Sequence, residues 1–170
     1  MLADTNRPHG QEERGMDIQE RFPECKQNGE YSWLENAPSY DAIVAAFGHT
    51  ILAQVDDNDY QGDSRYLLQS GERYGHLNIG WGSCSGCDAL QGCDTIAELQ
   101  DLADSIEGDI KWFASKDEAR TWFETHDWKG DYSWRSKEQA DYVEQVLKVL
   151  GSSLNVRRED DGFGITEVAP

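Results

Sequence analysis

The chain has 170 residues, of which 33 are Asp or Glu and only 15 are Lys or Arg, so its formal net charge is −18 and its isoelectric point is near 4.4. This balance excludes a protein that binds nucleic-acid phosphates, or an anionic membrane surface, through a general basic face. Hydrophobic residues make up 38% and aromatic residues 11% of the chain, which is enough for a folded core. Because no apolar run approaches the roughly 20 residues of a membrane span, and the first residues lack the apolar core of a secretory signal, we expect a cytoplasmic protein.

The composition divides the chain into three parts. Residues 1–30 are polar and contain few aliphatic side chains, which predicts a flexible N-terminal arm. Residues 31–150 hold most of the apolar side chains and are expected to form a single domain. Residues 151–170 are similar to the arm and predict a C-terminal tail, although residues 165–168 could add a short strand.

The front of the domain is predicted to contain one short helix followed by strands. Apolar residues at helical spacing predict a helix over Tyr40–Phe47 that ends at Gly48. Aliphatic and β-branched residues then predict strands over His49–Val55, Ser64–Gln69 and Arg73–Trp81. The dipeptide Ser70-Gly71 suits a tight hairpin turn, so we expect an antiparallel meander.

The back of the domain is predicted to be helical, because hydroxyl residues three positions before Glu or Gln form three capping boxes: Thr95 with Glu98, Ser115 with Glu118, and Ser136 with Gln139. Apolar residues recur at helical spacing behind each box. The short apolar run Ile110–Phe113 could form a fourth strand. The expected fold is therefore α+β, with a small antiparallel sheet of three or four strands and three or four helices packed on one face.

The negative charge is concentrated in the middle of the chain. Between Gln27 and Ile110 the only basic residues are Arg65 and Arg73, against fifteen Asp and Glu. In the first long helix of the back half, Asp101, Asp104 and Glu107 recur every three residues and stay near one side. A solvated face, an acidic surface for a basic partner and a cation site are the three interpretations of this pattern.

A second acidic segment, DDNDYQGDS, resembles half of a calcium-binding loop. Asp57 and Asp59 occupy ligand positions and Gly62 falls at the sharp turn, but the twelfth position is Leu68 where the loop needs a bidentate Glu. An acidic turn between two strands is the favoured interpretation. Asp56, Asp57 and Asp59 are added to the candidate contacts with a basic partner.

Three of the four cysteines, Cys84, Cys87 and Cys93, fall within ten residues, whereas Cys25 lies in the predicted arm. The C-x-x-C spacing is typical of metal binding and of redox chemistry. A zinc site could combine the three cysteines with His76, but a second closely spaced ligand pair is missing. A reactive thiol at a strand-to-helix turn, and cysteines that only pack, are the other two interpretations.

The segment THDWKGDYSW gathers aromatic and acidic side chains after a predicted helix. Rings that cap the core are the favoured interpretation. As a site, His126, Trp128 and Trp134 could hold a cationic side chain of a partner against aromatic faces.

Two of these motifs carry a resemblance. GWGSCSGCDALQGC followed by HDWKGDYSW is similar to an uncharacterised family of small acidic proteins from bacteriophages and some bacteria. The family has no established activity, so the resemblance implies no catalytic residue. It implies a phage or prophage setting, in which small acidic proteins often bind and inhibit host machinery.

The sequence therefore favours a non-enzymatic acidic protein that docks on a basic host protein, such as one that handles nucleic acid, in the host cytoplasm. Its predicted contacts are the acidic residues and the aromatic segment, and direct binding to nucleic acid or membrane is not expected. The alternative is a cysteine-centred module, using Cys84, Cys87 and Cys93 to bind a metal such as zinc or to carry out thiol chemistry.

Overall fold

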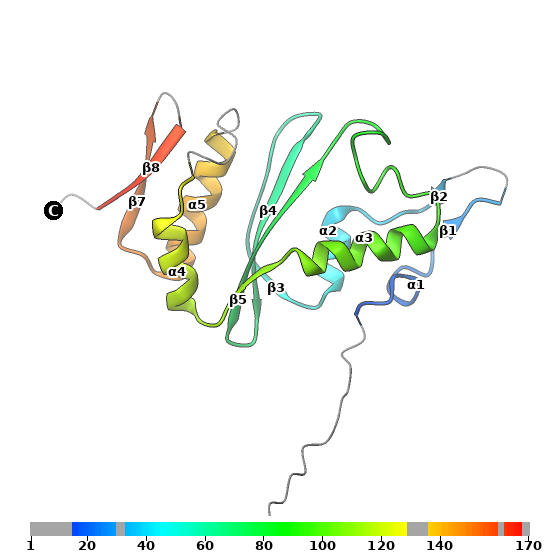
Figure 1. Ribbon diagram of the computed structural model, residues 1–170, viewed down its shortest axis with the longest axis horizontal. Coiled ribbons are helices and arrows are strands. Elements are labelled where there is room, and N and C mark those ends of the chain that lie inside the picture. Colours follow the sequence, from blue (N-terminus) through cyan, green and yellow to red (C-terminus); the bar gives the residue numbers. More distant parts are fainter. Residues whose placement is uncertain (1–14, 30–32, 129–135, 160–161, 168–170) are drawn as a thin grey trace, which may run out of the picture.

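The computed structural model describes residues 15–29, 33–128, 136–159 and 162–167, which form the α+β fold expected from the sequence (Figure 1). The described helices are α1 (Ile18–Arg21), α2 (Tyr40–Ala46), α3 (Ile96–Gly108), α4 (Lys116–Thr125) and α5 (Ser136–Leu150). The described strands are β1 (Lys26–Gln27), β2 (Leu34–Glu35), β3 (Thr50–Asp56), β4 (Gly62–Ser70), β5 (Arg73–Trp81), β6 (Lys111–Phe113), β7 (Leu154–Glu159) and β8 (Gly162–Glu167).

The main sheet has four antiparallel strands in the order β3-β4-β5-β6. β4 and β5 pair from Gly62 opposite Trp81 to Ser70 opposite Arg73. Gly71 has a φ of 59°, the left-handed backbone that a two-residue hairpin loop needs, so the predicted hairpin is present. β6 pairs with β5 and is the fourth strand that the Ile110–Phe113 run predicted.

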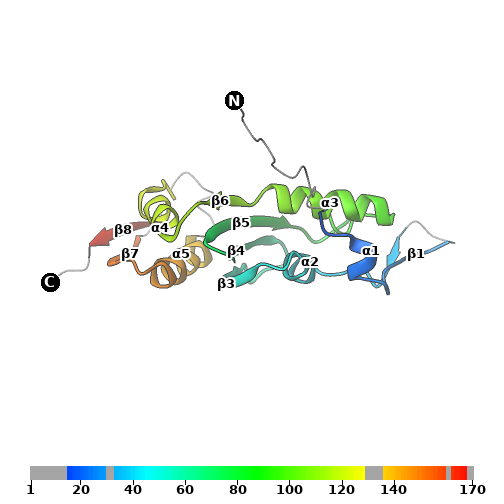
Figure 2. The same ribbon diagram turned by 90° about the horizontal axis from the view of Figure 1, so that it is seen from below.

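Helices cover both faces of the main sheet. Neighbouring residues of β4 point to opposite sides of the sheet, so this strand contributes side chains to both layers. Tyr66 and Leu68 share a core with residues of α1, α2 and α3, whereas Leu67 shares a core with residues of α4, α5 and β8. The two views in Figures 1 and 2 place these layers on either side of the sheet. This corrects the expectation that the helices share one face. β4 is buried over residues 64–68, and a strand buried on both faces needs cover on both.

Described parts of the predicted arm and tail belong to the packed structure. The Asp17 side chain caps α1 by accepting hydrogen bonds from two backbone N–H groups, and α1 places Ile18 in the core without exposed area. Cys25 is also fully buried. At the other end β7 pairs with β8, and Phe163 is buried in the core that includes α5. The packed unit therefore extends beyond residues 31–150 in both directions.

The predicted capping boxes differ in how completely they form. Thr95 and Glu98 form the full reciprocal box at the start of α3. At α4 the Ser115 side chain accepts from the Glu118 N–H, but the Glu118 carboxylate accepts from the N–H of Ala114. The side chain of Ser136 lies outside the described residues. Among the helices that the structure describes, none is long and apolar enough to cross a membrane.

Candidate functional site

The first candidate site is the surface where α1 lies against α3. Gln100 joins the two helices, because its Oε1 accepts from the Ile18 N–H at 2.8 Å and its Nε2 donates to the Met16 carbonyl at 2.7 Å. The same Nε2 donates to the carboxylate of Asp104 at 2.8 Å. Five acidic residues of α3 and of α1 with its N-cap are called the α1–α3 acidic face: Asp17, Glu20, Asp101, Asp104 and Glu107.

The carboxylates of the α1–α3 acidic face are not neutralised by ion pairs with described Lys or Arg side chains. Within the described ranges, Lys and Arg side chains form no ion pair with any of its five carboxylates, and Glu107 lies 4.0 Å from His49 Nε2. On α5, by contrast, Asp141 and Glu144 pair with three described cations, namely Lys137, Lys148 and Arg158. Four of the five residues of the acidic face are exposed, and Glu107 is half-buried. Asp101, Asp104 and Glu107 all belong to α3, spaced three residues apart.

The two ends of the acidic face differ in character. At one end, Asp17, Glu20 and Asp104 line a hollow of about 520 Å³ together with Arg21. At the other end, Glu107 lines a hollow of about 650 Å³ that also contains Arg21, Arg73 and His49. The Arg73 guanidinium lies 4.6 Å from the centre of the Trp112 ring in this second hollow. Arg21 lines both hollows, whereas Asp101 lines neither. A basic partner would therefore meet the least opposing charge near Asp101.

The three predicted contacts in the β3–β4 connection play different roles. Asp57 is 4% exposed, with one carboxylate oxygen 2.7 Å from Arg65 Nη1 and the other accepting from the Asp63 N–H at 2.8 Å. Asp56 and Asp59 are exposed. The segment is thus an acidic turn fixed by a buried ion pair, and Asp57 is a structural residue rather than a surface contact.

Of the predicted aromatic contacts, Trp128 lies in the core on the α5 side of the sheet. Trp128 is 6% exposed, and its Nε1 donates to the carbonyl of Phe123 at 3.0 Å. His126 is half-buried and stacks on Trp122, with ring centres 4.4 Å apart. Trp128 is therefore a core residue, which corrects its assignment as a partner contact. The prediction for Trp134 falls outside the described residues.

The four predicted metal ligands are not all brought together at one place. Cys84 and Cys87 are exposed, whereas Cys93 is 8% exposed and donates to the carbonyl of Ala89 at 3.2 Å. His76 belongs to the other face of the sheet, where it contacts residues of α4 and α5. In the described part of the chain, no group of three or more His, Cys, Asp or Glu side chains could hold a metal ion.

The partners of His76 define its role as a structural one. Its Nδ1 lies 2.8 Å from the hydroxyl of Tyr142, and that hydroxyl donates its single proton to the carbonyl of Tyr66 at 2.8 Å. Nδ1 must then be the donor in the first bond, which assigns the proton of a neutral His76 to Nδ1. The imidazole links β5 to α5 and leaves the cysteine loop without its predicted fourth ligand.

The loop that carries the cysteines is held by hydrogen bonds to Asp88, a buried residue that was not identified from the sequence. Asp88 is 6% exposed and accepts from the N–H groups of Gly82 and Gln91 and from the Tyr40 hydroxyl. Burial, above all, raises the pKa of Tyr40 to about 12, so this hydroxyl remains a donor. Residues 89–92, which follow the cysteine pair, form turns. The spacing Asp-x-x-Gln directly after C-x-x-C was the available signal, because an Asp side chain caps N–H groups two or three residues on.

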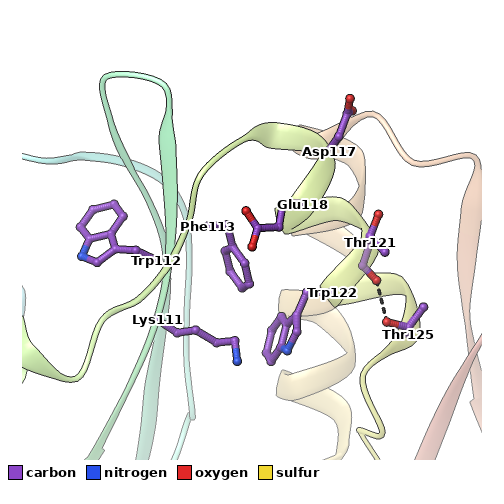
Figure 3. A pocket seen from close by; sticks show the side chains of 8 residues that line it. All are labelled: Lys111, Trp112, Phe113, Asp117, Glu118, Thr121, Trp122 and Thr125. Atoms are coloured by element: carbon purple, nitrogen blue, oxygen red, sulfur yellow. Dashed lines mark hydrogen bonds between the residues drawn. The ribbon is translucent and has the colours of Figure 1, made fainter.

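A further hollow of about 690 Å³ lies beside the edge strand β6 (Figure 3). The Lys111 ammonium lies 4.9 Å from the centre of the Trp122 ring and 5.9 Å from that of Phe113. Asp117 and Glu118 of α4 line the same hollow, so its charges are mixed. It contains none of the residues predicted to form a site.

No protein-family model matches this chain, and neither the curated proteins nor the solved structures contain a match.

Proposed function

We propose that this chain is a non-enzymatic binding protein that docks its α1–α3 acidic face on a basic partner and inhibits or modulates that partner. The observation that carries the proposal is the exposed pair Asp101 and Asp104, whose carboxylates form no ion pair with a described Lys or Arg, although Arg21 lines the same hollow as Asp104. Opposite charges attract over several ångströms and steer partners together, so an uncompensated acidic face favours a basic surface.

The charge of the whole chain supports a protein partner over nucleic acid. A net charge of −18 repels phosphates at long range, whereas proteins that bind nucleic acid present clustered Lys and Arg. Such a basic surface is the complement of the α1–α3 acidic face. The resemblance to small acidic phage proteins agrees with a target of this kind in a bacterial host.

The positions of the cysteines and His76 favour thiol chemistry over metal binding as the form of the cysteine-centred alternative. A metal site built on Cys84, Cys87, Cys93 and His76 would need side chains that the structure places on two sides of the sheet. Thiol chemistry at the exposed Cys84 and Cys87 needs no such assembly. The two ideas are independent, because a reactive loop and an acidic docking face can coexist in one protein.

The docking proposal is tested by neutralising the face without changing side-chain shape. The docking variant combines Glu20→Gln, Asp101→Asn and Asp104→Asn. The control variant combines Asp117→Asn, Glu138→Gln and Glu144→Gln, which removes the same number of charges from α4 and α5. Wild type and both variants are immobilised and used to capture proteins from a bacterial extract at low salt, with bound proteins identified by mass spectrometry.

We expect the docking variant to retain its partner at least about tenfold less than wild type, and the control variant to retain it fully. The bound protein should elute between about 0.1 and 1 M salt, since the screening length falls from roughly 10 to 3 Å over that range. If the partner binds nucleic acid, excess duplex DNA should displace it. Equal losses in the two variants, or capture that salt does not weaken, would refute docking through the α1–α3 acidic face.

A further inference from the structure

The loop between β5 and α3 presents two thiols to solvent. Cys84 and Cys87 are both exposed, and their Sγ atoms lie 2.7 Å apart. The backbone N–H of Cys87 donates to the carbonyl of Cys84 at 2.9 Å, which closes a four-residue turn. Such a turn keeps the two Cα atoms within about 7 Å, which is the range that a disulfide can bridge.

The turn is held in place rather than free to open. Gln91 Nε2 donates to the carbonyl of Gly82 at 3.1 Å, and the Asp88 carboxylate accepts from the Gly82 N–H at 3.0 Å. Gly82 is needed for this fit, because a Cβ there would lie 2.4 Å from the carbonyl oxygen and 2.7 Å from the Sγ of Cys87. Bringing the two sulfurs to bonding distance therefore requires little rearrangement of the loop.

The surroundings of Cys87 favour its ionised form. Its Sγ accepts a hydrogen bond from the Cys84 N–H at 3.1 Å. The hydrogen bond with the Cys84 thiol is the largest influence on the pKa of Cys87, and together with backbone N–H groups it lowers that pKa below the ordinary value. The thiolate is the attacking form in thiol–disulfide exchange, so Cys87 is the expected first nucleophile.

The other two cysteines provide an internal contrast. Cys25 and Cys93 are buried, and burial raises the pKa of both thiols. Neither sulfur presents an accessible thiolate to a disulfide in solution. Of the four thiols, only the Cys84–Cys87 pair combines exposure with close mutual approach.

We propose that Cys84 and Cys87 are a dithiol–disulfide exchange site that reacts with an external disulfide. The Cys87 thiolate attacks one sulfur of the external disulfide and displaces the other as a thiolate, forming a mixed disulfide. Cys84 loses its proton and attacks the sulfur of Cys87, which displaces the second external thiolate. In sum, one external disulfide is reduced to two thiols, and the protein dithiol is oxidised to one disulfide.

The test uses the full chain in mixtures of reduced and oxidised glutathione, followed by acid quenching, alkylation and mass spectrometry. As the oxidised fraction rises, the protein should lose two hydrogen atoms, with Cys84 linked to Cys87 and with Cys25 and Cys93 still free. Cys84→Ser should stop at a glutathione adduct on Cys87. In the reduced wild type, Cys87 should react with an alkylating reagent at least about tenfold faster than Cys93.

A matched pair of glycine variants tests the role of the turn. Gly82→Ala forces Cys87 to move, whereas Gly86→Ala adds a methyl group with nothing within 4 Å and keeps every cysteine. The first should lower the disulfide fraction at a given glutathione ratio, and the second should leave it unchanged. Because Gly82→Ala could disturb folding, the wild-type titration decides independently. A wild-type chain that never links Cys84 to Cys87, or one that accumulates only glutathione adducts, would overturn the proposal.

Discussion

At the scale of single residues, the Asp57–Arg65 pair is the clearest case of a charge used for stability. The Asp57 side chain has no exposed area and the Arg65 side chain is 7% exposed, so solvent screens their contact little. Removing one partner from a buried pair leaves an uncompensated charge. Asp63, 3.3 Å from Arg65, compensates part of it. We therefore expect Asp57→Asn to lower the free energy of unfolding by about 3 kcal/mol, measured by urea denaturation.

The exposed Asp59, two residues further on, supplies the control. Asp59→Asn makes the same chemical change in the same connection and should leave the urea midpoint close to that of wild type. Equal midpoints for the two variants would contradict a structural role for Asp57. The sequence could not distinguish these two aspartates, because both lie in one polar segment. Asp57 differs from Asp59 in its contact with Arg65, which β4 places beside it.

At the scale of the secondary-structure element, the capping box of α3 predicts a pH dependence. Glu98 Oε2 accepts from the N–H groups of Asp94 and Thr95 at 2.8 and 2.9 Å. These bonds, that to Asp94 first, lower the pKa of Glu98 in the folded protein. The stabilisation from ionised Glu98 is therefore present above its ordinary pKa of 4.5 and is lost as the pH falls through the lower folded value.

Glu98→Gln tests this link, because it retains an oxygen acceptor and cannot ionise. The variant should be less stable than wild type near neutral pH, and the gap should close as the pH falls below the ordinary glutamate pKa of 4.5. Thermal midpoints of both proteins across this range give the measurement. A gap that stays constant as the pH falls would mean that the charge of Glu98 does not stabilise α3.

The elements themselves were largely predictable, because their signals are local. β5 has the bounds expected from its aliphatic and β-branched residues, and α3 begins at the predicted box. Their packing was not predictable in the same way. The spacing of the cysteines indicated a pair at Cys84 and Cys87. The burial of Cys93, however, depends on a core that it shares with α2 and α3. Neither helix is part of the cysteine motif, so the motif alone could not predict that burial. His76 likewise finds its partner, Tyr142, 66 residues away.

At the scale of the whole molecule, the main sheet separates two cores. It thereby separates the acidic and cysteine candidates from the aromatic and histidine candidates. The α1–α3 acidic face and the cysteine loop belong to elements on one side, and Trp128 and His76 contact the core on the other. Three consecutive apolar residues of β4, Tyr66, Leu67 and Leu68, were the sequence signal for cover on both faces, since a strand with one solvent-exposed face alternates.

Two neighbouring leucines of β4 allow the two cores to be perturbed separately. Leu67 and Leu68 are both fully buried, but Leu67 packs in the core with α5 and Leu68 in the core with α3. Truncation to Ala should cost each variant about 2 to 5 kcal/mol of unfolding free energy, since it removes buried methyl groups and leaves a cavity.

The two truncations should differ in where the protein opens. Leu68→Ala should speed amide hydrogen exchange in α3 more than in α5, and Leu67→Ala should do the reverse, because local opening follows the loss of local packing. The variants act as controls for each other, with the same residue type, strand and substitution. If both produced the same exchange pattern, the two layers would open together through the sheet, and a ligand bound to the acidic face could then alter the stability of the α5 side.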